Sequence, residues 1–246
     1  MQLTLVSHYG PKPPALARLI IELQQLLAQQ LGTSFLPYAL EQVHATVVGL
    51  EGLRVGGKVR GENFWKLRGE ERWIDFESLL KFMRSPSFPT FTVQAGGFRA
   101  GDNYGFVSQG QPPQVRSFSL KSETAVAMGW PKAGDCFPST LDTLRRRFQT
   151  FGILHKWHAR PEDEDNDWFF VLGRMQPGMV PSTRLAAEAS ARLWLESRPP
   201  CLVSVTPQNL RFVAYADARL LPEQSRVLDW ADAAVTAALM ASIYDG

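Results

Sequence analysis

The stretch QVHATVVGLEG, residues 42–52, indicates more clearly than any other part of the sequence how the chain folds. It is a short run of β-branched and apolar residues that ends in glycine, which predicts a buried strand. Because side chains alternate along a strand, His44 and Thr46 share one face, and the apolar residues beside them share the other. An imidazole next to a hydroxyl suits proton transfer beside a bound anion. The alternative is a histidine that only bonds neighbouring backbone at the start of the strand.

The residues before this strand predict another strand and a long helix. Residues 3–7 are mostly apolar and β-branched, which is typical of a strand. Pro13 and Pro14 suit the first turn of a helix, and leucine and isoleucine then recur at helical spacing as far as Leu31. Gly32 suits the C-terminal cap of that helix. The chain therefore begins with the order strand, helix, strand.

The second half of the sequence repeats this order. Strands are predicted at 124–128 and 167–173, with a helix that starts near residue 138 between them. The remaining predicted elements are a helix after Asp75 and strands at 91–95, 104–107 and 117–120 in the first half, and a helix at 183–196 and strands at 202–205 and 211–215 in the second. Apart from one additional strand in the first half, both halves thus run strand, helix, strand, helix, strand, strand, which indicates an internal duplication.

These elements predict an α+β fold with a duplicated β-α-β-α-β-β order. Two antiparallel sheets should face each other across a central cleft, with the helices outside. No low-complexity linker interrupts residues 1–246, so we expect one bilobal domain. Lobe one would span about 1–120 and lobe two about 121–221, followed by a C-terminal helix at 222–244.

Composition limits the class of protein. An apolar share of 45% and a charged share of 20% are typical of a soluble globular chain. A net charge of +2 argues against bulk electrostatic binding to nucleic acid. Two cysteines, Cys136 and Cys201, fit a reducing cytoplasm better than a disulfide framework. The first residues lack the features of a signal peptide, and no apolar run reaches the roughly 18 residues of a membrane span. A cytoplasmic protein without membrane contact is expected.

A basic, glycine-rich segment at residues 53–73 follows the motif strand. It contains six basic and three acidic side chains, with three aromatic residues among them. Cations interleaved with aromatic rings can hold phosphates and stack bases. The candidate substrate-binding residues of this segment are Lys58, Arg60, Trp65, Lys66 and Arg68. The alternative is a solvated loop that its aromatic residues anchor to the core.

The first strand, the long helix and the motif His44-Ala45-Thr46-Val47 running into Val48-Gly49-Leu50 resemble the first half of the 2H phosphoesterase superfamily. That superfamily includes the RNA 2′,3′-cyclic phosphodiesterases, also called 2′-5′ RNA ligase-like proteins. Its pattern is His-x-Thr/Ser-x, once per lobe, on a central strand of each lobe. The order of elements matches over most of the chain, and the sequence matches over about the first fifty residues.

The resemblance implies chemistry at phosphorus without a metal or cofactor. Two histidines would act as acid and base, and hydroxyls would bind the non-bridging oxygens. By position, His44 would be one acid or base and Thr46 one phosphate ligand. The ligand would be a 2′,3′-cyclic phosphate or a related nucleotide or RNA end.

The second half departs from the family pattern. When the glycines that end the two motif strands are aligned, Trp168 and Phe170 stand at the histidine and threonine positions. When this alignment is shifted by one residue, Phe169 and Val171 stand at the two positions instead. None of these side chains moves a proton or binds an anion through a hydroxyl, so the second motif is missing.

Two further histidines lie just before the degenerate strand. His155 and His158 are candidate catalytic residues if the loop at 159–166 folds back toward the cleft. Their alternative is a place at the surface or at a helix terminus. Lys156 and Arg160 would then serve as phosphate ligands instead.

An acidic run at residues 162–167 raises the question of a metal site. Its aspartates alternate as in a calcium loop, but Trp168 and Arg174 stand where an EF-hand needs glycine and glutamate. Two histidines without cysteines are a weak signal for zinc. We therefore expect a solvated acidic loop and no metal.

Two classes of function remain. The first is a phosphoesterase that hydrolyses a cyclic phosphate at a nucleotide or RNA end. The second is a catalytically inactive protein on the same fold that binds nucleotides, RNA or another partner. The intact motif at His44 favours an enzyme, and the missing second motif favours a binding protein.

Overall fold

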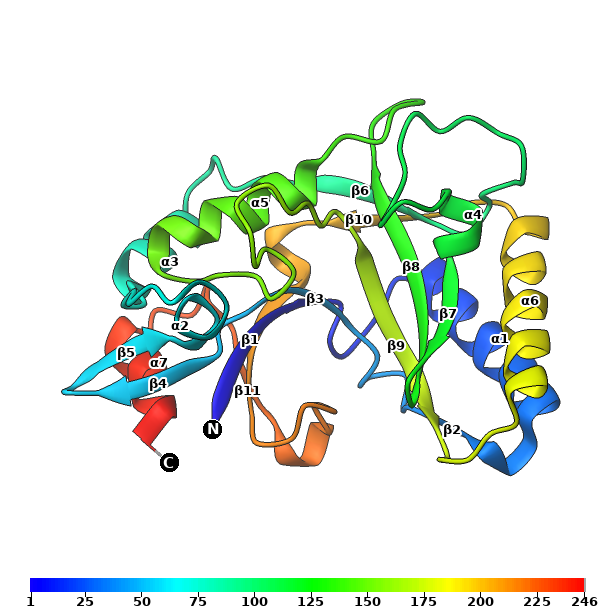
Figure 1. The fold of residues 1–246 in the computed structure, drawn as a ribbon. Helices are drawn as coiled ribbons and strands as arrows, with labels where there is room; N and C mark the ends of the chain where they lie inside the picture. The colour runs from blue at the N-terminus through cyan, green and yellow to red at the C-terminus, as the bar shows by residue number, and fades with distance from the viewer. Residues whose placement is uncertain (246) are drawn as a thin grey trace.

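The computed structural model describes residues 1–245 and has an α+β fold, as the sequence predicts (Figure 1). Its strands form one large antiparallel sheet and a separate small sheet. The large sheet contains β1 (Gln2–Ser7), β2 (Phe35–Pro37), β3 (Ala45–Gly49), β6 (Phe91–Ala95), β7 (Phe118–Lys121), β8 (Thr124–Lys132), β9 (Trp168–Met175), β10 (Cys201–Val205), β11 (Leu210–Tyr215) and β12 (Arg226–Leu228). The small sheet pairs β4 (Gly52–Val55) with β5 (Lys58–Gly61).

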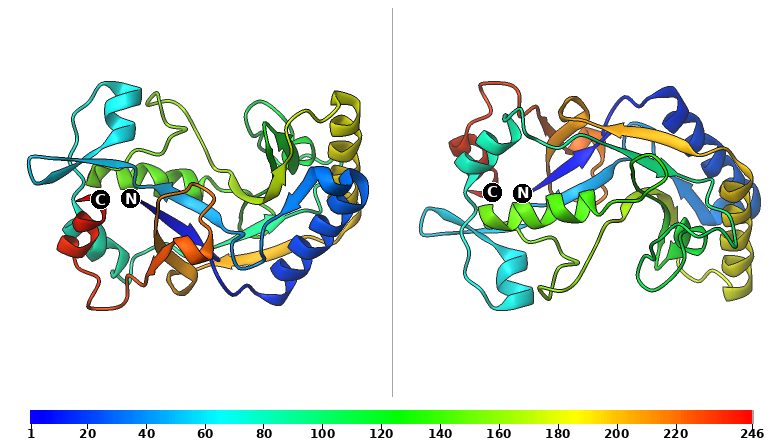
Figure 2. Two further views of the ribbon diagram at one scale, coloured as in Figure 1. Left: turned by 90° about the horizontal axis from the view of Figure 1, so that it is seen from below. Right: turned by 90° about the horizontal axis from the view of Figure 1, so that it is seen from above.

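The helices gather at the two ends of the large sheet. They are α1 (Pro14–Leu31), α2 (Glu62–Arg68), α3 (Phe76–Met83), α4 (Pro113–Arg116), α5 (Thr140–Phe148), α6 (Pro181–Ser197) and α7 (Ala237–Ser242). Helices α1 and α6 pack side by side at one end of the molecule, and α2, α3, α5 and α7 lie toward the other (Figures 1 and 2). The two chain termini lie near each other at this second end (Figure 2). Within residues 1–245, no helix is both long and apolar enough to cross a membrane.

The large sheet consists of two matching halves. Along its main path the strand order is β10-β6-β8-β9-β3-β1-β11-β12, with four strands on each side of the contact between β9 and β3, while β2 and β7 pair off this path with β9 and β8. On one side β1, α1 and β3 form a strand–helix–strand unit, and on the other β8, α5 and β9 form the same unit. A single bridge between Ala45 and Phe170 joins β3 to β9. Both motif strands are internal, as continuous apolar runs predict.

The two halves exchange strands. β6, from the first part of the chain, pairs with β8, whereas β11, from the last part, pairs with β1. Each strand–helix–strand unit leaves one strand edge whose N–H and C=O groups need a partner, and a strand from the far part of the chain supplies it. The predicted lobe boundaries at 1–120 and 121–221 are therefore wrong as a description of the halves, because neither half is one continuous segment.

Helix α1 has the boundaries and the buried face that the sequence predicts. Its buried side chains include Leu16, Leu23 and Leu27, each at most 2% exposed. Complete burial of one such side chain contributes about 1.5–3 kcal/mol to stability. Pro14 opens the helix, and Gly32 closes it with a φ of 55°, a conformation that glycine adopts without steric cost.

Residues 222–244, predicted as a helix, are mostly not helical. Arg226–Leu228 form the edge strand β12 beside β11, and the only α-helix in this segment is the short α7. The side chains of Asp229 and Asp232 accept backbone N–H groups two residues on, from Ala231 and Ala234. These local bonds stabilise turns in competition with a helix.

The basic segment and one predicted strand also differ from expectation. Residues 53–73 form the β4–β5 hairpin and α2 rather than an open connection. Gly56 and Gly57 supply the two positive φ angles, 55° and 82°, of its tight turn. Residues 104–107 do not form a strand; Tyr104 and Phe106 instead pack on the aromatic cluster around Phe98.

Candidate functional site

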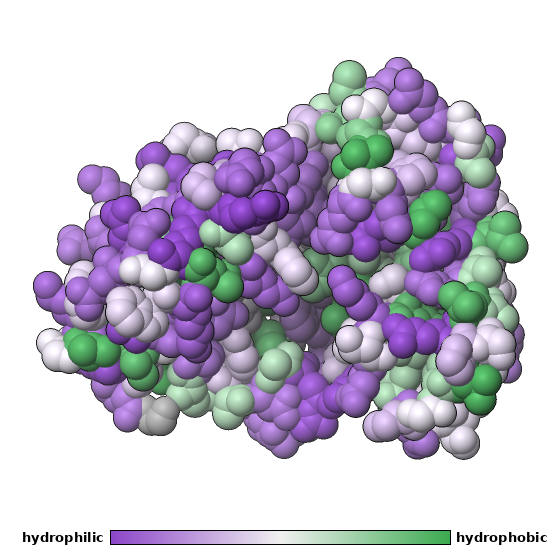
Figure 3. Space-filling model, in the orientation of Figure 1, coloured by the Kyte–Doolittle hydropathy of each residue, from purple (hydrophilic) through white to green (hydrophobic). Residues whose placement is uncertain are grey.

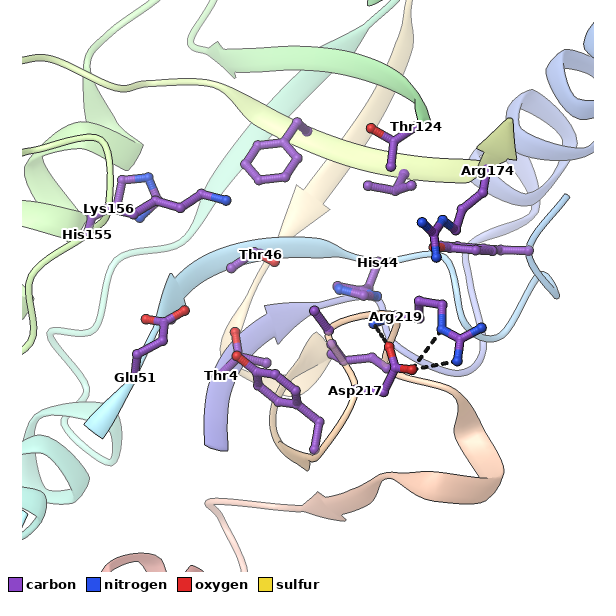
Figure 4. A pocket seen from close by; sticks show the side chains of 17 residues that line it. Thr4, His44, Thr46, Glu51, Thr124, His155, Lys156, Arg174, Asp217 and Arg219 are labelled. Carbon is purple, nitrogen blue, oxygen red and sulfur yellow. Dashed lines mark hydrogen bonds and ion pairs between the residues drawn. The ribbon is translucent and has the colours of Figure 1, made fainter. Parts of the chain in front are cut away.

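A cavity of about 410 Å³ opens where the two halves of the sheet meet. Strands β1 and β3 form one wall, β8 and β9 form the other, and the β11–β12 connection at residues 216–225 borders it (Figure 4). The space-filling view shows a deep hollow at the centre of the molecule (Figure 3). The lining residues are Thr4, Tyr38, His44, Thr46, Gly49, Glu51, Thr124, His155, Lys156, Phe169, Val171, Arg174, Tyr215, Asp217, Ala218, Arg219 and Leu220.

A β-bulge makes residues from both parts of the motif strand, before and after the bulge, face the cavity. The pairing of β1 with β3 runs Leu5–Val48 and then Val6–Thr46, so Val47 is the extra residue. The extra residue shifts the alternation of faces by one position. His44 and Thr46 before the bulge and Gly49 and Glu51 after it therefore all line the cavity.

The backbone fixes the tautomer of His44. Its Nδ1 lies 2.7 Å from the carbonyl oxygen of Gln42, which can only accept, so Nδ1 carries the proton. Desolvation, with a smaller contribution from the nearby Lys12 cation, lowers the pKa of His44 to about 4. The Tyr9 ring meets the imidazole edge-on at 5.6 Å between centroids. At neutral pH, His44 is thus a neutral imidazole whose Nε2 can accept a proton.

The same bulge occurs in the second half and defines which residues correspond. The pairing of β8 with β9 runs Ala125–Gly173 and then Val126–Val171, so Leu172 is the extra residue there. Aligning the two bulges places Phe169 at the position of His44 and Val171 at that of Thr46. Phe169 and Val171 line the cavity.

The alignment of Gly173 with Gly49, which places Trp168 and Phe170 at the positions of His44 and Thr46, is therefore wrong. Both side chains are 1% exposed and belong to the core. The Trp168 indole donates to Ser7 Oγ at 3.0 Å on the far side of the strand. A bulge adds a residue on one strand only and shifts the alternation of side chains. Two residues at the same distance from Gly49 and Gly173 therefore need not lie on the same face of the sheet.

His155 and His158 lie in a buried polar network rather than opposite His44. Nε2 of His155 is 2.7 Å from Asp165, and Nε2 of His158 is 2.9 Å from Asp142. Desolvation, and then the charge of Arg145, lower the pKa of His155 to about 3. His155 borders one end of the cavity, with Thr46 between it and His44 in Figure 4. His158 does not line the cavity.

Arg145 is the centre of this network and supports the motif strand. It is fully buried and lies 3.2 Å from the Asp165 carboxylate. It also donates to the carbonyl oxygens of Thr46 and Val47 at 3.1 and 2.9 Å. A buried guanidinium thus holds the bulge of β3 in place and needs the carboxylate beside it.

The five candidates from the basic segment lie outside the cavity. Arg60 pairs with Glu62 at 2.9 Å and stacks on Trp65, and Lys66 pairs with the same glutamate. Arg68 donates to the carbonyl oxygens of His158 and Ala159, and Lys58 lies over the Trp73 ring. The structure does not bring Lys58, Arg60, Trp65, Lys66 or Arg68 together with His44.

The cations that do line the cavity come from three separate parts of the chain. Arg219 pairs with Asp217 at 2.8 Å, and Arg174 pairs with Glu123. Lys156 is exposed and makes no ion pair within residues 1–245. The sequence pointed to Lys156 but to neither arginine, because no local pattern links residues 174 and 219 to the motif. Arg160, the other cation considered from the sequence, instead pairs with Asp163 at the surface.

Hydroxyl groups and one carboxylate complete the site. Thr4 on β1 and Thr124 on β8 occupy equivalent positions in the two bulged pairs, facing Gly49 and Arg174 respectively. Asn63 holds the Glu51 carboxylate at 3.0 Å. Within residues 1–245, no three His, Cys, Asp or Glu side chains are placed to hold a metal ion. Among the described residues, the site offers a proton acceptor, several hydroxyls, an unpaired cation and an apolar wall.

Comparisons with known proteins do not assign a family. No protein-family model matches the sequence, and no curated protein matches it. The crystal structure of TT0787 of Thermus thermophilus is similar over 93% of this chain and 94% of its own, with 13% identity and a TM-score of 0.41. ATU0111 from Agrobacterium tumefaciens, a conserved protein of unknown function, is similar over 82% of this chain and 79% of its own, with 12% identity and a TM-score of 0.37.

Proposed function

We propose that the cavity binds the phosphate-bearing end of a nucleotide or RNA, such as a 2′,3′-cyclic phosphate, and turns it over slowly or not at all. In this proposal the chain is a member of the 2H phosphoesterase superfamily with one of its two motifs lost. The observation that carries the proposal is the pair of equivalent bulged strands. One places His44 and Thr46 in the cavity, and the other places Phe169 and Val171 there.

The polar wall has the groups that a phosphate needs. The hydroxyl of Thr46 and the Nε2 of His44 lie on one face of one strand, where they can meet two oxygens of the same phosphate. Lys156 supplies a positive charge at the opposite wall (Figure 4). Arg174 and Arg219 can shift from their carboxylate partners to the ligand, because both are partly exposed.

The remaining groups suit a nucleoside rather than an inorganic ion. The Phe169 ring forms part of the apolar wall and can pack on a base or a ribose. The Glu51 carboxylate can accept a hydrogen bond from an amino group of a base, while it repels a phosphate placed beside it. The phosphate is therefore expected nearer His44 and the nucleoside nearer Glu51.

Turnover should be weak because one proton carrier is missing. Displacement at phosphorus needs a base for the entering water and an acid for the leaving oxygen. The lowered pKa of His44 leaves it neutral, which fits a base and not an acid. Phe169 holds the equivalent position and carries no proton. The loss of one such group costs a factor of about 10²–10⁴ in rate, or about 3–5 kcal/mol.

A second candidate function is a working phosphodiesterase in which His155 replaces the missing histidine. In its favour, His155 borders the same cavity, and its Nδ1 is buried without a hydrogen-bond partner within residues 1–245. Against it, the imidazole is only 1% exposed, and Asp165 occupies its Nε2. A proton transfer from His155 would require the loop that carries it to open.

Calorimetric titration with 2′,3′-cyclic nucleotides tests the proposed function. We expect the wild type to bind and the His44→Ala, Thr46→Ala double variant to lose at least about ten-fold in affinity, since both phosphate contacts are removed. The matched control is the Lys58→Ala, Lys66→Ala double variant, which removes two cations outside the cavity and should bind like the wild type. Unchanged affinity in the first variant, or a loss in the second, would place the site elsewhere.

A hydrolysis assay on the same proteins separates the two candidates. The proposed function predicts little or no product from the wild type. Substantial hydrolysis that is lost in both His44→Ala and His155→Ala would support the second candidate instead. Such an enzyme would show a bell-shaped pH profile with two apparent pKa values.

A further inference from the structure

We infer that a second subsite adjoins the His44 cavity and takes the next base and phosphate of a single-stranded nucleotide chain. The inference rests on the proposed function, because it places the end of that chain in the His44 cavity. The second cavity has a volume of about 400 Å³ and shares Thr124, Lys156, Phe169 and Val171 with the first. Because the two cavities adjoin at these shared residues, a ligand that fills the first can extend directly into the second.

The aromatic part of the subsite is an exposed tryptophan. The Trp157 side chain is 45% exposed and lines the second cavity. The ammonium groups of Lys121 and Lys156 lie 5.6 and 5.5 Å from the centre of its ring, and that of Lys156 lies 5.8 Å from Phe169. An exposed indole flanked by cations is the combination that stacks a base and holds the adjoining phosphate.

The charge of the second cavity favours an anion. Lys121 and Lys156 make no ion pair within residues 1–245. Two carboxylates also line the cavity, but Arg116 lies 2.8 Å from Asp167, and Arg145 lies 3.2 Å from Asp165. The carboxylates are thus compensated, whereas the two ammonium groups are not.

A polar atom in the wall also lacks a partner. Ser119 lines the second cavity, and its Oγ is buried without a hydrogen-bond partner within residues 1–245. A buried hydroxyl without a partner is unfavourable, and an oxygen of a bound ligand would satisfy it. Several uncompensated groups, two ammoniums and one hydroxyl, therefore meet beside one exposed ring.

The two subsites together distinguish a chain from a mononucleotide. A mononucleotide would fill the His44 cavity and leave Trp157 uncovered. A dinucleotide that ends in a 2′,3′-cyclic phosphate would add a base on Trp157 and a phosphate beside Lys121. Since stacking is possible for any base, the second subsite should show little sequence preference.

The test compares the affinity of the full chain for a 2′,3′-cyclic mononucleotide with its affinity for such a dinucleotide. We expect the dinucleotide to bind about 5- to 150-fold more tightly, which is the range for one stacked base. Trp157→Ala should remove this gain and leave the mononucleotide affinity unchanged, and Trp157→Phe should keep part of it. Both variants should fold, because the side chain is exposed.

A salt titration tests the phosphate contact independently. Lys121→Ala should reduce the slope of log affinity against log salt by about 0.7 for the dinucleotide only, as expected when one phosphate contact is lost. Lys81→Ala, an exposed lysine on α3, is the control and should change neither slope. If both ligands bind equally well to the wild type, the second subsite is refuted while the proposed function stands. If neither ligand binds, the second subsite and the proposed function are both refuted.

Discussion

Ala45 on β3 and Phe170 on β9 are bridged through their backbones, and this bridge sets the geometry of the cavity. In an antiparallel register, the residues on either side of a bridged pair face each other. His44 therefore lies toward Val171 and Thr46 toward Phe169. Each polar motif residue of the first half meets an apolar residue of the second half across the junction.

This relationship predicts how a second motif can be restored. The Phe169→His, Val171→Thr double variant puts an imidazole and a hydroxyl at the positions equivalent to His44 and Thr46. We expect hydrolysis of 2′,3′-cyclic nucleotides to rise by about 10²-fold or more over the wild type, because the missing proton carrier is supplied. A discontinuous assay of the released monophosphate measures it.

The matched control for that variant tests the register. The Trp168→His, Phe170→Thr double variant introduces the same two residues at the alternative alignment. It should gain no activity and should lose at least about 3–5 kcal/mol of stability, because both native side chains are 1% exposed in the core. Activity in this variant would contradict the correspondence of the two bulges.

The histidines predict a loss of stability as the pH falls below neutral. Desolvation lowers the pKa of both His8 and His44 to about 4 and, together with the charge of Arg145, that of His155 to about 3. The unfolded chain, with histidine pKa values near 6.5, binds more protons than the folded chain below that pH. Stability should therefore fall from pH 6.5 toward 5, at up to about 1.4 kcal/mol per pH unit for each histidine.

Urea unfolding at several pH values measures this slope. His8→Asn is the informative variant, since asparagine tolerates the φ of 57° found at this position. The variant should unfold with a smaller dependence on pH between 6.5 and 5. An unchanged slope would mean that His8 is protonated equally in the folded and unfolded states.

Arg145 should be essential to stability. Arg145→Met removes a fully buried cation from beside the Asp165 carboxylate and leaves the carbonyl oxygens of Thr46 and Val47 without this donor. We expect a loss of about 3–5 kcal/mol in the free energy of unfolding. Arg147→Met, on the exposed side of the same helix, should cost less than about 1 kcal/mol. Equal losses in the two variants would argue against a special role for the buried network.

Lys156 should contribute to binding through charge alone. Lys156→Ala is expected to weaken cyclic nucleotide binding by about 5- to 30-fold at low salt, and by less as the salt concentration rises. Lys156→Arg should restore most of the affinity. A loss that did not change with salt would point to packing of the lysine stem on Trp157 rather than to its charge.

Much of the fold could be predicted from local patterns. The leucines of α1 recur at helical spacing, Asp75 caps α3 by accepting the N–H of Ser78 at 2.9 Å, and both motif strands are continuous apolar runs. These features depend on residues close together in sequence, so they are visible without a structure.

The candidate site was harder to predict because it depends on pairing. His44 and Thr46 follow from alternation along one strand. The bulge at Leu172 decides whether Phe169 or Trp168 faces the cavity, and nothing in the local sequence marks a bulge. Arg174 reaches the cavity from β9 and Arg219 from the β11–β12 connection, and both segments are distant in sequence from the motif.

The exchange of strands has a consequence for how the chain must fold during synthesis. β1 pairs with β11 from Gln2–Tyr215 to Ser7–Leu210, so β1 is synthesised about two hundred residues before the strand that completes its pairing. Until then, one edge of β1 is unpaired and much of the leucine face of α1 is exposed, so both can associate with other chains. A chain that stopped short of Leu210 would keep the complete His44 motif, yet the strand beside that motif would lack its outer neighbour. Synthesis as far as β11, rather than completion of an N-terminal lobe, is thus the step after which this wall of the cavity can form.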